Sequence, residues 1–244
     1  MKKGVLYIFH GSRLKESKEE AFSFFQDVKR EVPYEIQEMC FLELAKPTVK
    51  EGFAACVEKG AADIAVIPVL LLAAGHAKQD IPAILADLQV DYPEAKIFYG
   101  NPLGVESLMV QAVIDRIQNV WTRSAKRTKI ILIGRGSHDA EMKGDFEALG
   151  RMLEEKLEVA TICCYLTAAS PLFHNVVQSV PMMMEEEIII VPYLLFKGLL
   201  LKDVQKEVEE LQKQTGKSIL LTDHIGDHPA VKKLLRLRVE EAFS

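Results

Sequence analysis

The sequence predicts an α/β protein made of two similar doubly wound parallel-sheet domains that arose from an internal duplication. Short apolar runs alternate with longer segments of helical periodicity along the chain. The run Gly4-Val-Leu-Tyr-Ile-Phe-His-Gly-Ser-Arg13 resembles Lys129-Ile-Ile-Leu-Ile-Gly-Arg-Gly-Ser-His138. Pro47 and Pro171, which end similar segments, lie 124 positions apart, close to half of the 244 residues. A duplicated domain is the simplest explanation of this spacing.

The length also favours two domains, because 244 residues exceed the about 150 residues of a typical domain. Polar residues between Trp121 and Lys129 form the expected linker. We therefore predict an amino-terminal domain over residues 1–122 and a carboxy-terminal repeat over residues 128–244.

Four apolar runs predict the strands of the first half, and the longer segments between them predict the covering helices. These runs are Gly4–Phe9, Ile36–Leu42, Ile64–Leu72 and Lys96–Gly100. Strands rich in Ile, Val and Leu without strict alternation suit a parallel sheet that is buried on both faces.

The first helix is expected to begin at a capping box formed by Ser17 and Glu20, three residues apart. Ala21, Phe25 and Val28 recur at helical spacing on one side. We interpret this apolar stripe as part of the core.

The second half repeats the pattern. Ile188–Val191 predicts a fully buried strand. Pro229 is suited to the first position of a helix, and the preceding Asp223–His228 contains ligand types at close spacing. We interpret this cluster as a helix start in preference to a metal site.

Charge and composition narrow the class of partner. The chain has 30 Lys and Arg against 35 Asp and Glu, a net charge of −5, which argues against binding of nucleic acid or anionic lipid. The apolar run Ile64–Ala77 is shorter than the about 20 residues of a membrane span, so no membrane association is expected. We expect a small molecule or another protein as partner.

Cysteine usage points to a reducing compartment. The sequence has four cysteines without CxxC spacing and an amino terminus whose apolar run ends at Phe9, too early for a secretion signal. We therefore expect a cytoplasmic protein. A monomer is compatible with the sequence, which leaves the oligomeric state open.

Candidate functional residues follow three predicted strands. Ligands bind parallel sheets at the carboxyl ends of the strands, where His10, Glu43 and His76 stand. A strand order of 2-1-3-4 would make these three ends neighbours. Two imidazoles and a carboxylate form a reasonable site for a divalent transition metal and for proton abstraction.

The second half tests whether these side chains are required by the fold. At the matching places stand Arg135, Thr167 and Leu200, give or take one position. A residue that the fold needs would recur in both copies. The function is therefore assigned to the amino-terminal domain, and the repeat domain lacks the catalytic histidine pair.

These segments resemble the class II sirohydrochlorin chelatases of the SirB and CbiX type, in their two-domain form. The matching segments are the strand end His10-Gly-Ser-Arg13, the stretch Phe41–Thr48, and Val66–His76 running into Lys78-Gln-Asp-Ile-Pro82. The resemblance covers both halves, and the three segments together are specific to the family.

The resemblance implies a lyase that inserts Fe²⁺ into sirohydrochlorin to give sirohaem, with release of two protons. The divalent metal, Fe²⁺ or Co²⁺, is then a substrate, and no permanent cofactor is implied. His10, Glu43 and His76 are the implied catalytic residues and metal ligands. The predicted contacts to the tetrapyrrole are Arg13, Ala45, Leu71, Leu72, Ala73, Ala74, Gly75 and His76, with Lys46 and Lys78 placed to meet its carboxylates.

Other interpretations remain open at this point. Cobalt insertion is the nearest alternative, although the chain lacks the histidine-rich tail that many long cobalt-specific relatives carry. A non-enzymatic carrier of tetrapyrrole or metal is another. His10 could be an ordinary buried histidine, Glu43 could cap the next helix or pair with Lys46, and Leu71 and Leu72 could simply end a buried strand.

Overall fold

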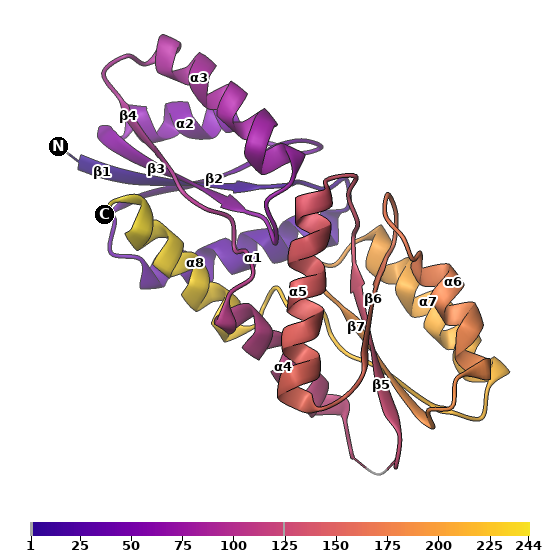
Figure 1. The fold of residues 1–244 in the computed structure, drawn as a ribbon. Coiled ribbons are helices and arrows are strands. Elements are labelled where there is room, and N and C mark those ends of the chain that lie inside the picture. Colours follow the sequence, from indigo (N-terminus) through magenta and orange to yellow (C-terminus); the bar gives the residue numbers. More distant parts are fainter. Residues whose placement is uncertain (1, 124) are drawn as a thin grey trace. The chain divides into compact units, whose positions relative to one another are not determined.

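The structure is a computed structural model that describes residues 2–123 and 125–244. Strands alternate with helices along the chain (Figure 1). The elements are β1 (Lys2–Phe9), α1 (Lys15–Glu31), β2 (Ile36–Phe41), α2 (Val49–Glu58), β3 (Ala61–Val69), the π-helical turn η1 (His76–Asp80), α3 (Ile81–Asp91), β4 (Lys96–Tyr99), α4 (Ser107–Val120), β5 (Thr128–Gly134), α5 (Ala140–Leu157), β6 (Thr161–Tyr165), α6 (Phe173–Ser179), the 3₁₀ turn η2 (Val180–Met182), β7 (Glu187–Pro192), α7 (Leu199–Gln214), β8 (Ser218–Leu221) and α8 (Pro229–Ala242).

Two four-stranded parallel sheets confirm the predicted fold class. Their strand orders are β2-β1-β3-β4 and β6-β5-β7-β8, so each sheet has the order 2-1-3-4. In each sheet the second strand lies on one side of the first strand, and the third strand lies on the other side. The strand order therefore reverses beside β1 in the first sheet and beside β5 in the second. All pairings between neighbouring strands are parallel.

The core of the first sheet lies on both of its faces, because β1 and β3 are buried along most of their length. On one face Leu6 and Val66 pack with Phe53 of α2 and Ile81 at the start of α3. On the other face Tyr7 packs edge-on against Phe25 of α1, with ring centroids 5.5 Å apart. The predicted apolar stripe of the first helix is therefore core, as expected.

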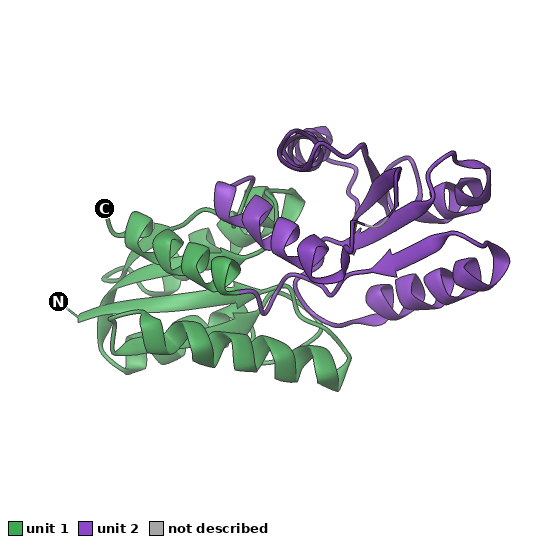
Figure 2. Ribbon diagram, turned by 90° about the horizontal axis from the view of Figure 1, so that it is seen from below, with its two compact units in different colours: residues 1–104, 229–244 green, residues 105–228 purple. Residues whose placement is uncertain are grey.

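The compact units divide the chain differently from the predicted bounds 1–122 and 128–244. One unit contains residues 1–104 and 229–244, and the other contains residues 105–228 (Figure 2). Helix α8 packs on α1 and β3 of the first unit, where Lys232 forms an ion pair with Asp27. Helix α4 packs on α5 and β7 of the second unit. The last helix of each sequence repeat thus belongs to the compact unit of the other repeat. Ser124, in the predicted linker, lies outside the described residues.

Two predicted boundaries were wrong. Helix α1 begins at Lys15, before the predicted capping box, because the Ser12 hydroxyl accepts a hydrogen bond from the Leu14 N–H at 3.1 Å and stabilises an earlier start. Ser17 is buried within the helix and does not cap it. Strand β3 ends at Val69, because the next carbonyls, Leu70 and Leu71, accept hydrogen bonds from the 103–104 segment. The last helix does begin at Pro229, as predicted.

Among the described residues, no helix combines the length and the low polarity that a membrane crossing requires.

Candidate metal-binding site

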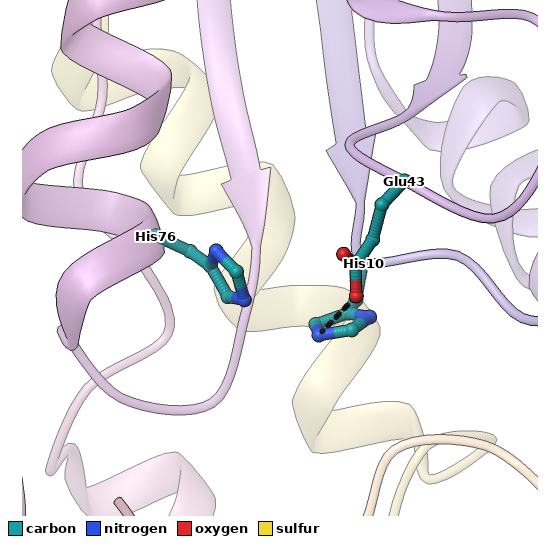
Figure 3. A group of neighbouring side chains, drawn as sticks. All are labelled: His10, Glu43 and His76. Carbon is teal, nitrogen blue, oxygen red and sulfur yellow. Dashed lines mark ion pairs between the residues drawn. The ribbon is translucent and has the colours of Figure 1, made fainter. Parts of the chain in front are cut away.

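Three neighbouring strand ends bring His10, Glu43 and His76 together. His10 follows β1 directly, Glu43 lies two residues after β2, and His76 begins the turn η1 after β3. Because β1 lies between β2 and β3, the segments that follow these strands meet at one edge of the sheet. Figure 3 shows the three side chains converging, with the His76 ring facing His10.

The distances suit one shared ion. His10 Nε2 lies 3.4 Å from Glu43 Oε1, and the two imidazole rings have centroids 5.0 Å apart at an interplanar angle of 82°. One donor atom from each of the three residues lies within 4.8 Å of the others. Two ligands held about 2.1 Å from one ion at a tetrahedral angle are themselves about 3.4 Å apart. His10 Nε2 and Glu43 Oε1 already have this separation.

A glycine allows the His10 and Glu43 backbones to approach each other. Gly11 has φ +102°, and a Cβ atom at this position would lie 1.8 Å from the carbonyl oxygen of Glu43. The Glu43 N–H donates to the carbonyl of His10 at 3.1 Å, and Leu44 continues the turn with φ 63°. This backbone arrangement places the Glu43 side chain over the His10 ring.

The site remains accessible to a bulky ligand. The side chains of His10, Glu43 and His76 are 22%, 45% and 39% exposed. Two imidazoles and one carboxylate suit divalent iron and similar ions, and they leave coordination positions free. Such a set can bind an ion and release it again, unlike a four-cysteine structural site.

Asp80 is a further residue of this site, which the sequence analysis did not single out. Its Oδ2 lies 2.7 Å from His76 Nδ1, so Nε2 is the ring nitrogen left for a metal. The signal was present in the sequence, since Asp80 follows His76 by four residues and the two can share a helix face.

The alternative interpretations of Glu43 do not fit the structure. Thr48, not Glu43, caps α2, in a reciprocal capping box with Glu51. Lys46 pairs with Glu51 at 3.2 Å, whereas the carboxylate of Glu43 faces His10.

The predicted tetrapyrrole contacts lie on the loops around these ligands. Arg13 and Lys78 are exposed, and Ala45 is partly buried in the loop after β2. Within the loop after β3 only Leu72 is buried, and a Cβ atom at Gly75 would have nothing within 4 Å. Four further predicted contacts in this loop are partly buried, namely Leu71, Ala73, Ala74 and Gly75.

The second unit repeats the backbone of the site without its side chains. Gly136 has φ +93°, and its Cβ would lie 1.8 Å from the carbonyl oxygen of Thr167, as at Gly11 and Glu43. The Thr167 N–H donates to the carbonyl of Arg135 at 3.0 Å. Leu199 follows Gly198 as His76 follows Gly75. The fold therefore needs this turn but does not need a histidine or a carboxylate in it.

The carboxy-terminal cluster has a structural explanation. His228 Nε2 lies 3.2 Å from Asp115 Oδ2, and Asp227 pairs with Arg116. Burial lowers the pKa of His228 below its usual range, with Asp115 opposing the shift. Over residues 2–123 and 125–244, only one group of three or more potential ligands has donor atoms close enough together to hold a metal ion. That group is His10, Glu43 and His76.

Comparison with known proteins places these observations in a family. The family model named CbiX matches residues 4–120 and 129–242, one range in each half of the chain. Sirohydrochlorin ferrochelatase of Bacillus subtilis is 39% identical over 242 residues, 99% of this chain and 92% of the relative. Sirohydrochlorin cobaltochelatase of Priestia megaterium is 33% identical over 99% of this chain and 80% of the relative. The structure of SirB from Bacillus subtilis with Fe³⁺ aligns with a TM-score of 0.90 at 39% identity, covering 99% of this chain and 96% of that one. The chain therefore belongs to the CbiX family of sirohydrochlorin chelatases.

Proposed function

We propose that this protein is a sirohydrochlorin ferrochelatase, a lyase that inserts Fe²⁺ into sirohydrochlorin to give sirohaem. The observation that carries the proposal is the convergence of His10, Glu43 and His76 at one edge of the first sheet. The second unit, which has the same turn, carries Arg135 and Thr167 at the corresponding places. The activity is therefore assigned to the amino-terminal repeat.

The three side chains act as exchangeable ligands and as proton acceptors. Fe²⁺ is a substrate, held first by His10 Nε2, a Glu43 oxygen and His76 Nε2. Insertion forms bonds from the ion to the ring nitrogens and releases two pyrrole protons, without a change in oxidation state. A neutral imidazole that gives up the ion can accept one of these protons, and the accessible Glu43 carboxylate can carry protons to solvent.

The surrounding loops supply contacts for the macrocycle. The loop from Leu71 to Gly75 offers a mainly apolar surface with open space above Gly75. Arg13 and Lys78 are exposed cations beside it, suited to the carboxylates of sirohydrochlorin.

Cobalt insertion is the second candidate, and the similarity to a cobaltochelatase favours keeping it. Imidazole and carboxylate ligands accept both metals, so the donor set alone does not select one. We further propose a monomer in the cytoplasm that binds neither nucleic acid nor membrane. The four cysteines support this compartment, since all are free thiols.

The decisive experiment is a multiple-turnover assay. Purified protein is mixed anaerobically with excess sirohydrochlorin and Fe²⁺, Co²⁺ or Ni²⁺, and the absorbance change is compared with a protein-free control. We expect many equivalents of product per protein and the highest initial rate with Fe²⁺. A single equivalent would indicate a carrier, and a higher rate with Co²⁺ would identify a cobaltochelatase.

A further inference from the structure

The turn that carries His76 differs from its counterpart in the second unit. In η1 the Ile81 N–H donates to the carbonyl of His76, five residues earlier, which makes the turn π-helical. In the second unit the corresponding helix, α7, is α-helical from Leu199 onward. A π-turn is less stable than an α-turn and usually persists because other contacts hold it.

Tyr99 makes one such contact. It ends β4, next to Val66 of β3, and its hydroxyl donates to the carbonyl of Ala77 at 2.7 Å. Pro82, five residues after Ala77, has no N–H and cannot continue the π-helical pattern. Burial raises the pKa of Tyr99 to about 12, so the hydroxyl stays protonated and remains a donor at neutral pH. Tyr99 therefore ties the His76 turn to the edge of the sheet.

Asp80 makes the other contact, at the ring itself. With its Oδ2 2.7 Å from His76 Nδ1, the carboxylate favours the tautomer that carries the proton on Nδ1. The Nε2 lone pair is then directed away from Asp80, and the His76 ring is packed edge-on to His10 (Figure 3). A carboxylate behind a metal-binding histidine typically changes metal affinity by about 10- to 100-fold.

We propose that Asp80 and Tyr99 are positioning residues, which hold the His76 ring and its turn so that Nε2 faces His10 and Glu43. This inference rests on the proposed function, because it assigns to His76 the role of a metal ligand. Neither residue touches the ion or the macrocycle in this account. Both act through His76.

The second unit supplies a matched control. Asp203 follows Leu199 by four residues, as Asp80 follows His76, but Leu199 has no ring nitrogen to orient. Leu221 pairs with Ile190 as Tyr99 pairs with Val66, and it has no hydroxyl. The carboxylate recurs without the histidine, so an aspartate at this helix position is not by itself evidence of function. The control variant Asp203→Asn tests this distinction.

The experiment measures the His76 tautomer and metal binding separately from turnover. We would record ¹⁵N spectra of the histidine rings and titrate Co²⁺ into the wild type, Asp80→Asn, Tyr99→Phe, His76→Ala and Asp203→Asn. Asp80→Asn should shift His76 toward mixed tautomers and weaken Co²⁺ binding about tenfold. Tyr99→Phe should weaken binding by a few-fold while preserving the tautomer, and Asp203→Asn should match the wild type.

The outcomes separate the two proposals. If His76→Ala weakens Co²⁺ binding while Asp80→Asn and Tyr99→Phe bind like the wild type, the positioning roles are wrong and the metal site stands. If His76→Ala itself binds Co²⁺ normally, the proposed metal site is wrong. A melting temperature within about 2 °C of the wild type for Tyr99→Phe excludes general unfolding as the cause of weaker binding.

Discussion

The carbonyl oxygen of Glu43 lies so close to Gly11 that a Cβ atom on the glycine would be 1.8 Å away. This approach joins the loop after β1 to the loop after β2, and it brings the Glu43 carboxylate to His10. The same relationship holds between Thr167 and Gly136 in the second unit. One backbone arrangement therefore serves two units, and among the described residues only the first unit carries a group of three potential metal ligands on it.

Replacing the glycine of this turn should lower stability in either unit, but it should lower the insertion rate only in the first unit. Gly11→Ala and Gly136→Ala each force a side chain into a left-handed backbone, at a cost of about 1–3 kcal/mol, in addition to the close contact. We expect both variants to lower the free energy of unfolding by similar amounts in urea titrations. Only Gly11→Ala should also lower the insertion rate of the folded protein. Equal loss of rate in Gly136→Ala would show that the rate follows stability alone.

Loss of either histidine should abolish most insertion. His10→Ala and His76→Ala each remove a ligand or proton acceptor from an accessible site, so we expect rates about 100-fold lower with little loss of stability. Arg135→Ala, at the place of His10 in the second unit, is the control and should stay within a few-fold of the wild type. Initial rates at saturating metal measure the effect. A loss in Arg135→Ala as large as in His10→Ala would place part of the active site in the second unit.

Gly75→Ala should separate substrate binding from stability. The residue has helical φ and ψ, and the added methyl group would meet no protein atom within 4 Å. Alanine should therefore maintain stability or raise it by up to about 1 kcal/mol. If the macrocycle packs over this position, the half-saturating concentration of sirohydrochlorin should rise several-fold. Gly144→Ala is the matched control for the effect of alanine on helix stability. Gly144 lies in α5, and a Cβ atom there would also have no neighbour within 4 Å. Identical substrate dependence in both variants would exclude Gly75 from the binding surface.

The cations near the site should influence tetrapyrrole recognition through charge. We expect the double variant Arg13→Ala, Lys78→Ala to raise the half-saturating concentration of sirohydrochlorin and to make it less dependent on salt, because two of the attractive charges are gone. Metal affinity should not change. Lys46, the third cation predicted to meet the carboxylates, pairs with Glu51 in the structure, so Lys46→Ala serves as the control. The test measures the initial rate as a function of sirohydrochlorin concentration at two ionic strengths. If the double variant has the same half-saturating concentration as the wild type, the carboxylates of sirohydrochlorin bind elsewhere.

His228 should make stability depend on pH. Burial lowers its pKa below the unfolded value of about 6.5, so the unfolded chain binds a proton more readily than the folded one as the pH falls. The free energy of unfolding should therefore decrease below about pH 6.5, with no contribution from this group at higher pH. Urea titrations at pH 7.5 and 5.5 should show a smaller decrease for His228→Gln than for the wild type. An equal decrease in both would assign the pH dependence to other groups.

Local patterns were sufficient to predict the architecture and the three potential ligands. Buried runs such as Ile64–Val69 indicate strands, because short runs rich in β-branched residues suit the interior of a parallel sheet. The strand-end rule then points to His10, Glu43 and His76. Comparison between the two halves separated these residues from the scaffold, since Arg135 and Thr167 occupy the same turn without the same chemistry.

The tertiary structure alone decided where helices α4 and α8 pack, where β3 ends, and which groups hold His76. Periodicity shows that a helix such as α8 has an apolar side, but either repeat could cover that side. The contact between Tyr99 and Ala77 joins residues 22 positions apart on different elements. The spacing of four residues between His76 and Asp80 is visible in the sequence, but only the structure shows that the Asp80 carboxylate contacts the His76 ring. The sequence alone determined the fold class and the ligand types, because both follow from local burial patterns and from the residues at the strand ends. The packing partners of the helices and the contacts that support the site depend on segments that are distant in the sequence.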